Sequence, residues 1–394
     1  SSRIEKQLFL ETDKYTLTAT ETVSGEDFAI TYESLTPANV DNAGDIVLFP
    51  EVGTIVDVTF KLTTETKDAT PVTVEKQVTV KLGRPAPTSI DAAAAAAVNV
   101  GDVVSFEGYY FGANGSTAQF VDGVSSLGAA VRSHSGLEVG KWYVLVVERA
   151  AVYNGLDQFN FKGALDSTKT EAPALPAAFA NSLTNENLLA VQNGAIVLEK
   201  MKVVKVPTDN SGALEYTLEN LAGERVNFRE HKDSTAHQAA VLALNLQLDE
   251  WVNVTSAIVS WFNNPQLTLA TLEKTIVTDQ EIFDASIPRL EAQLPLAGTL
   301  YYENFTLPIE HEGAAVAWEV TTGVAATVDA EGLVTLVKQD VEADVTLTGT
   351  VTKGELTPNT VTVTVKVAAL DDVPPTETLL TTIDFGAAAV TGYG

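Results

Sequence analysis

The clearest fold signal lies near the end of the chain, in Ala326-Thr327-Val328-Asp329-Ala330-Glu331-Gly332. Its first residues alternate in polarity as a strand does. The Val-Asp-x-x-Gly pattern then predicts a hairpin in which Asp329 closes the turn and Gly332 takes the left-handed conformation. A closely similar stretch occupies residues 38–44 near the start of the chain. The two ends of the chain therefore predict two copies of one β-module.

Two further blocks follow each hairpin in the same order and at a nearly constant offset. Residues 57–60 correspond to residues 344–347, and residues 78–82 correspond to residues 363–367. The second pair alternates branched apolar residues with polar ones, which is typical of a strand with one buried face. Several short strands at this spacing predict a sandwich of two sheets.

These motifs carry a resemblance to a known family. Residues 295–368, with Trp318 expected between two sheets, resemble the short immunoglobulin-like domain that is repeated in bacterial surface and secreted proteins. Residues 14–83 match less well, because Ile30-Thr31-Tyr32 stands where the tryptophan strand should be. The resemblance implies a spacer or an adhesive stalk, without catalytic residues to carry over.

The middle of the chain repeats as well. Residues 137–144 correspond to residues 246–253, and residues 153–159 correspond to residues 262–267. The second pair joins an aromatic residue to an Asn-rich turn, which predicts a tight hairpin between two strands. A long first strand, a hairpin, a crossover and two final strands predict a small barrel in each copy.

Each copy resembles the OB-fold modules of bacterial extracellular nucleases and related surface proteins. The resemblance covers residues 88–165 and, more loosely, residues 188–273. Its motifs are structural turns, so they imply the fold more than the function. We expect Trp142 and Trp251 to occupy equivalent positions, on the strand before the aromatic-Asn hairpin.

The predicted fold class is therefore all-β, with tandem modules: two Ig-like β-sandwiches flanking two OB-like β-barrels. The predicted domains are 1–83 (sandwich), 84–170 (barrel), 171–279 (second barrel), 280–368 (sandwich with a leading helix) and 369–394 (a linker and the start of a further module).

Two helices are expected between these β-modules. The first covers Asp91–Val98, with Ser89 or Asp91 near its N-cap. The second covers Thr278–Gln293, where Asp279 could cap the helix and Pro288 should kink or end it.

Charge and composition exclude several classes of partner. The net charge is -28, and the two predicted barrels together hold thirteen Lys and Arg against twenty-one Asp and Glu, so we expect no nucleic-acid binding. No apolar stretch approaches the ~20 residues of a membrane span. The chain has no cysteine, which excludes disulfides and thiolate sites and fits bacterial surface proteins as well as some cytosolic ones.

No convergent catalytic pattern stands in the sequence. The richest polar cluster is residues 229–237, but His231 and His237 are six residues apart, which is not a zinc-ligand spacing. His134 and His311 lie elsewhere, and the serines near His134 lack an orienting group. We therefore expect no enzyme activity, with no catalytic and no cofactor-binding residues.

Carboxylate pairs offer one route to a metal. Calcium could bind at a module joint; otherwise these residues form solvated turns. The candidate pairs are Glu310 with Glu312, Asp371 with Asp372, and Asp329 with Glu331.

Aromatic residues on the barrels offer a route to a ligand, and core packing is the alternative, because strand alternation sends about half of them inward. These residues are Tyr109, Tyr110, Phe111, Phe120, Trp261 and Phe262.

Two functions remain open. The first is a non-catalytic extracellular structural protein, a surface-layer, stalk or filament subunit at the cell surface that assembles through its β-domains with itself or neighbouring surface proteins. The alternative is a set of accessory modules that bind carbohydrate or nucleic acid for a longer secreted enzyme such as a nuclease.

Overall fold

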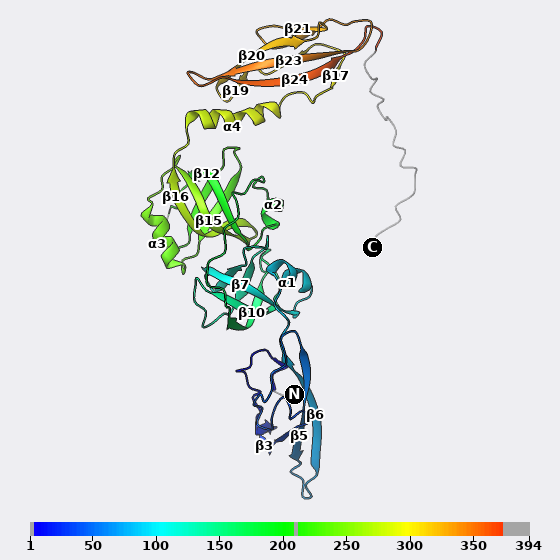
Figure 1. Ribbon diagram of the computed structural model, residues 1–394, viewed down its shortest axis with the longest axis vertical. Coiled ribbons are helices and arrows are strands. Elements are labelled where there is room, and N and C mark those ends of the chain that lie inside the picture. The colour runs from blue at the N-terminus through cyan, green and yellow to red at the C-terminus, as the bar shows by residue number, and fades with distance from the viewer. Residues whose placement is uncertain (1–3, 209–211, 373–394) are drawn as a thin grey trace, which may run out of the picture. The chain divides into compact units, whose positions relative to one another are not determined.

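The computed structural model describes residues 4–208 and 212–372, and these confirm the all-β fold class. About 45% of the chain lies in strands and 9% in helices. The chain divides into two compact units, Ser1–Ile276 and Val277–Gly394 (Figure 1). The strand expected at residues 379–383 lies outside the described residues.

The first unit begins with a four-stranded sheet in the order β1-β6-β5-β4. A small β2–β3 hairpin accompanies it, and Tyr15, Val58 and Phe60 lie in the buried core. The strands are β1 Gln7–Leu8, β2 Thr20–Val23, β3 Glu26–Ala29, β4 Thr31–Ser34, β5 Ile55–Glu65 and β6 Thr73–Gly83. The layer opposite the sheet is made largely of loops, with isolated bridges such as Val40 to Ile46.

Two closed five-stranded barrels follow in the same unit. In each barrel the first strand pairs with the second and the fourth, and the third strand pairs in parallel with the fifth. The first barrel contains β7 Val103–Asn114, β8 Thr117–Val121, β9 Ala129–Arg132, β10 Trp142–Arg149 and β11 Phe159–Asp166. The second contains β12 Ala195–Lys205, β13 Leu214–Glu219, β14 Arg225–Glu230, β15 Trp251–Phe262 and β16 Asn264–Thr275.

The barrels confirm the predicted duplication. Trp142 is the first residue of β10 and Trp251 is the first residue of β15, and each strand is the fourth of its barrel. A short helix precedes the first strand in both, α1 Ile90–Ala96 and α2 Asn185–Leu189. The hydroxyl of Ser89 accepts a hydrogen bond from the Ala92 N–H, which confirms Ser89 as the N-cap of α1. The second barrel adds α3 Thr235–Ala243 in its crossover.

The second unit is a sandwich of a five-stranded and a three-stranded sheet. The larger sheet has the order β17-β24-β23-β20-β19, and the smaller has the order β18-β22-β21. The strands are β17 Leu300–Tyr301, β18 Phe305–Thr306, β19 Glu310–His311, β20 Ala314–Thr322, β21 Ala326–Val328, β22 Leu333–Leu336, β23 Ala343–Thr352 and β24 Asn359–Val367. Trp318 packs against both apolar clusters of this unit.

The helix α4, Asp279–Glu291, leads into this sandwich and lies along its larger sheet (Figure 1). Its N-cap is Thr278, which forms a capping box with Glu281, so the expectation that Asp279 caps the helix is wrong by one residue. The threonine hydroxyl reaches the Glu281 N–H, while Asp279 lies in the first turn, where a carboxylate favours the positive end of the helix dipole. Pro288 does not end the helix, which continues to Glu291.

The predicted turn is the same in both sandwich modules. The carboxylate of Asp329 accepts the Leu333 N–H at 2.8 Å, and that of Asp41 accepts the Asp45 N–H at 2.9 Å. The following glycine, Gly332 in the second unit, has a φ of 78°, in the left-handed region that favours glycine. Its counterpart has a φ of 85°. The duplication inferred from the two sequence ends therefore holds at the level of individual hydrogen bonds.

Candidate functional site

The two barrels of the first unit contact each other through the polar cluster at residues 229–237. The hydroxyl of Ser234 donates a hydrogen bond to the Ala113 carbonyl of the first barrel at 3.1 Å. The ring of His231 lies against Gly115, and His237 lies close to Gly112. This cluster thus packs against the β7–β8 hairpin. Both histidines lie at the contact between the barrels.

The two aromatic-Asn turns also meet at this junction. The Asn263 N–H donates a hydrogen bond to the Asn154 carbonyl at 2.7 Å. The side chain of Gln192 donates to the Gly155 carbonyl at 3.0 Å. A Cβ atom on Gly155 would collide with the indole of Trp261, so only glycine allows this close approach. The turns are therefore held by one another as well as by their own barrels.

Tyr153 and Phe262 stand on these turns with their rings in solvent. Tyr153 is 55% exposed and Phe262 is 47% exposed, and the ring centroids are 6.4 Å apart at an interplanar angle of 54°. Across residues 4–208 and 212–372, every other aromatic side chain is buried or half-buried. The guanidinium of Arg229 lies 5.9 Å from the Phe262 ring and forms an ion pair with Glu215 at 3.0 Å. The two exposed aromatic side chains, 109 residues apart in sequence, are thus neighbours.

Glu230 is a fully buried carboxyl group beside the same junction. One of its oxygens accepts the Ala270 N–H at 2.9 Å, and the other has no hydrogen-bond partner among the described residues. Burial raises the pKa of Glu230 to about 7. The adjacent Leu269 has a φ of 52° and contacts Gly112 of the first barrel. Glu230 therefore holds the backbone at the point where the second barrel reaches the first.

The aromatic candidates of the first barrel are mostly packed away. Tyr110 and Phe120 are buried in the barrel core, where their rings stack 5.1 Å apart. Tyr109 packs edge-on against Trp142, and Phe111 packs on an apolar cluster shared with the second barrel. The core-packing alternative therefore holds for Tyr110 and Phe120, whereas Tyr109 and Phe111 are half-buried beside the second barrel and Phe262 is exposed.

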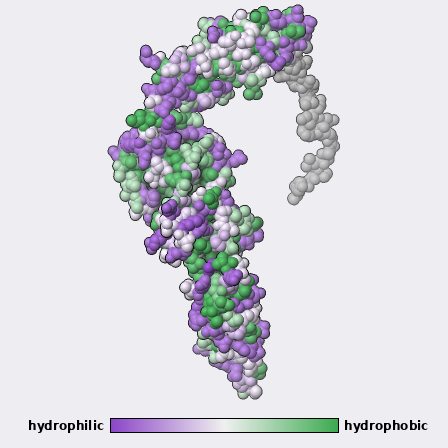
Figure 2. Space-filling view, viewed as in Figure 1, coloured by the Kyte–Doolittle hydropathy of each residue, from purple (hydrophilic) through white to green (hydrophobic). Residues whose placement is uncertain are grey.

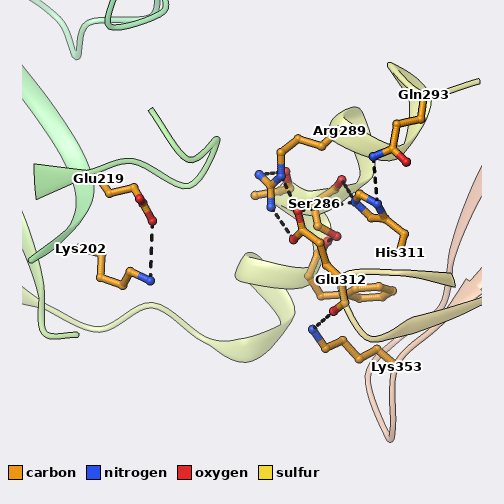
Figure 3. A network of polar contacts seen from close by, with 10 residues as sticks. Lys202, Glu219, Ser286, Arg289, Gln293, His311, Glu312 and Lys353 are labelled. Atoms are coloured by element: carbon orange, nitrogen blue, oxygen red, sulfur yellow. Dashed lines mark hydrogen bonds and ion pairs between the residues drawn. The ribbon is translucent and has the colours of Figure 1, made fainter. Parts of the chain in front are cut away.

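The two remaining histidines lie in separate contacts. The Nε2 atom of His134 is 3.0 Å from the hydroxyl of Tyr110, and burial lowers the pKa of His134. His311 is buried in the second unit, where its Nε2 lies 3.0 Å from the Ser286 carbonyl and its Nδ1 faces Gln293 (Figure 3). Both rings are engaged by neighbours within their own module.

The predicted calcium candidates have other partners. Arg289 of α4 binds both carboxylate oxygens of Glu312, at 2.8 and 2.7 Å, and Lys353 donates to its backbone carbonyl (Figure 3). Asp329 and Asp372 accept backbone N–H groups, while Glu310 is exposed. Within the described parts of the chain, no group of three or more acidic or histidine side chains could hold a metal ion.

Sequence reasoning missed the meeting of the two turns, although one signal was present. An Arg-x-His pattern ends the third strand of each barrel, at Arg132-Ser133-His134 and at Arg229-Glu230-His231. Aligning the barrels on that pattern would have matched Arg229 of the second barrel to Arg132 of the first. It could not have shown which surface of the second barrel faces the first.

Comparisons with known proteins add no family. No protein-family model matches the chain, and no curated protein matches it. Among solved structures, mouse cadherin-23 EC22-24 shows 13% identity over 86% of this chain and 86% of that chain, with a TM-score of 0.15. The protocadherin GammaB4 extracellular domain shows 10% identity over 93% of this chain and 48% of that chain, with a TM-score of 0.16. TM-scores this low carry no argument, so the fold rests on the sheet topology.

Among the described residues, no helix is long and apolar enough to span a membrane. Figure 2 shows hydrophilic residues spread over the visible face of each unit, with smaller apolar areas among these residues.

Proposed function

We propose that the chain is a non-catalytic extracellular structural protein, a surface-layer, stalk or filament segment that assembles through its β-domains. The observation that carries this proposal is the duplication: each kind of module occurs twice. The two barrels share one strand pairing, and the two sandwiches share four strands in one order, β1-β6-β5-β4 and β17-β24-β23-β20. The two barrels share one strand order, and we propose that they are OB-like modules that serve as rigid spacers. Polar side chains such as Asp41, Asp329 and Gln192 hold backbone groups in place, as expected of a scaffold.

Open strand edges provide a route to assembly. The strand β1 pairs with β6 only at Lys81 and Leu82, and β17 pairs with β24 only at Lys366 and Val367. Within the described residues, β6 and β24 therefore each have one edge without a strand partner over most of their length. Such an edge presents N–H and C=O groups that a neighbouring chain can complete. Copies of the chain, or neighbouring surface proteins, are the partners that we propose.

Charge should control this assembly. Residues 280–394 hold four Lys and Arg against seventeen Asp and Glu, so free chains repel one another. Salt screens this repulsion over ~8–10 Å at physiological ionic strength, and calcium could bridge the carboxylates. Assembly should therefore strengthen with added salt or calcium, whereas nucleic-acid binding would weaken with salt.

Sedimentation velocity of the full chain across a salt and calcium series tests the proposal. Larger species should form as salt or calcium rises, and hydrogen exchange should slow in β6 and β24. A monomer in every condition, at high micromolar concentration, would overturn assembly and leave a plain spacer.

A second function, as ligand-binding accessory modules, is favoured by one observation, the exposed aromatic pair at the barrel junction. A search for binding by single-stranded DNA tests its nucleic-acid branch. We expect no salt-sensitive, sub-micromolar binding, because the acidic barrels repel a polyanion.

A further inference from the structure

We propose that Tyr153 and Phe262 form a binding site for one chain of a neutral carbohydrate. The inference goes beyond the structural role and does not depend on assembly. It starts from exposure, because these two rings are the aromatic side chains that the described residues leave in solvent, and they lie 6.4 Å apart. Burial would stabilise each ring, so their shared exposure at one place points to a ligand.

The aromatic faces supply the apolar half of the site. A pyranose ring has a face of C–H groups with partial positive charge, and the face of an aromatic ring carries negative charge density. The two rings are tilted by 54°, so together they make an angled surface. An angled surface fits the side of a single soluble glycan chain better than the flat face of a crystalline polysaccharide.

The polar half of the site surrounds the rings. Asn263 and Asn264 are exposed, and no hydrogen bond engages their side-chain amides within the described residues. Arg229 and Glu215 add a donor and an acceptor beside Phe262, and their ion pair at 3.0 Å leaves no net charge there. Amides and a neutralised ion pair suit sugar hydroxyls, which both donate and accept hydrogen bonds. The net charge of -28 further disfavours an anionic polymer.

The site is held rigid before any ligand arrives. The Asn263 N–H binds the Asn154 carbonyl at 2.7 Å, and Gln192 binds the Gly155 carbonyl at 3.0 Å. Both turns use left-handed residues, with φ of 50° at Asn154 and 62° at Asn263. Rigid contact residues lose little entropy on binding, which favours a ligand that offers a small contact area.

Saturation-transfer NMR and calorimetry on the full chain test this site. The probes are four soluble neutral hexasaccharides: cellohexaose, xylohexaose, mannohexaose and a β-1,3-glucan hexaose. We expect at least one to bind, and the double variant Tyr153→Ala with Phe262→Ala to weaken that binding at least tenfold. Tyr153→Phe should retain it, because the ring face remains.

The controls are Val139→Ala and Leu248→Ala, which shorten exposed apolar side chains, 60% and 55% exposed, elsewhere on the two barrels. They should bind as the parent does. Both aromatic side chains are in solvent, so unchanged hydrogen exchange in β10 and β15 should show that the double variant folds. The proposal is overturned if no hexasaccharide binds at millimolar concentration, if the double variant binds as the parent does, or if a dT12 oligonucleotide binds more tightly than every sugar. Sedimentation of the double variant should match the parent, which separates this site from assembly.

Discussion

The first and the last sandwich share a backbone frame, meaning the same Asp-Gly turn and the same strand pairing, and they differ in the side chains that pack on it. In both modules a lysine near the end of the last strand pairs with a short parallel strand. Lys81 of β6 pairs with Gln7 of β1, and Lys366 of β24 pairs with Leu300 of β17. In the last sandwich, however, Trp318 lies opposite Gly349. At the corresponding register of the first sandwich, Tyr32 lies opposite Leu62, as the Ile30-Thr31-Tyr32 stretch implied.

The difference shows that the sizes of the two side chains in a cross-strand pair depend on each other. A Cβ atom on Gly349 would lie 3.0 Å from three carbons of the Trp318 ring, so the large indole takes the space that the glycine leaves. The smaller phenol of Tyr32 faces a full leucine instead. Both aromatic groups donate to a nearby backbone carbonyl, Trp318 to Pro308 at 2.7 Å and Tyr32 to Thr18 at 3.0 Å. The shared strand pairing therefore accepts either a large aromatic side chain opposite glycine or a smaller one opposite leucine.

Substitutions of the glycine in the shared turn should have the largest effect on stability, and the effect should be similar in the two sandwiches. Gly44→Ala and Gly332→Ala should each destabilise their own module by about 4 kcal/mol, because φ is positive and the new Cβ would collide with the Tyr15 and Leu307 carbonyl oxygens. Hydrogen exchange measured by mass spectrometry reports each module separately.

Gly25→Ala and Gly354→Ala are matched controls. Both positions have positive φ, but nothing lies within 4 Å of the added Cβ, so each should cost about 1 kcal/mol. Equal losses in controls and test variants would show that the shared turn is not a close-packed feature.

The helix is the largest difference between the two sandwiches. Leu290 of α4 is fully buried, and α4 covers an apolar extension of the larger sheet that includes Val351 and Val361. At the same register the first sandwich carries Thr64 and Lys76, and residues 4–83 contain no helix. Leu290→Ala should therefore cost about 3 kcal/mol in the last sandwich and leave exchange in β5 and β6 unchanged. Ile282→Ala, at a solvent-exposed position on the same helix, is the control. An equal loss from both variants would contradict packing of this helix face.

The cross-strand pair permits an exchange between modules. Gly349→Leu alone should destabilise the last sandwich by about 2 kcal/mol, because the new side chain meets the Trp318 ring. Adding Trp318→Tyr, which copies the pair of the first sandwich, should recover a large part of that loss. A double-mutant cycle followed by hydrogen exchange measures the coupling. Additive losses would mean that the two positions are filled independently.

The sequence predicted the frame better than the contacts between modules. Asp329 and Gly332 could be assigned because a turn places both residues within four positions of each other. The internal repeat of residues 137–144 and 246–253 placed Trp142 and Trp251 at equivalent positions. The helix cap was misplaced by one residue, because Thr278 and Asp279 are both able to cap. The approach of Tyr153 to Phe262 depends on how two folded barrels dock, and no local pattern encodes such docking.

The smallest expected effect concerns the ion pair that fastens α4 to the β19–β20 turn. The hydrogen bond from Arg289 holds the pKa of the Glu312 carboxyl below its usual value. Because the folded-state pKa is depressed, the pair stabilises the last sandwich above about pH 4.3 and stops doing so as the pH falls through the folded pKa. The carboxylate is 45% exposed, so solvent screening should limit the contribution to less than about 1 kcal/mol.

Glu312→Gln should therefore speed exchange in α4 at pH 6.5 and have little effect at pH 3, when each variant is compared with the parent at the same pH. The described part of the first sandwich has no such helix, so its exchange should not respond to the substitution at either pH. Glu310→Gln removes a neighbouring exposed carboxylate and serves as the control. An equal effect of Glu312→Gln at both pH values would show that the side chain acts through packing, and that the electrostatic difference between the two sandwiches is negligible.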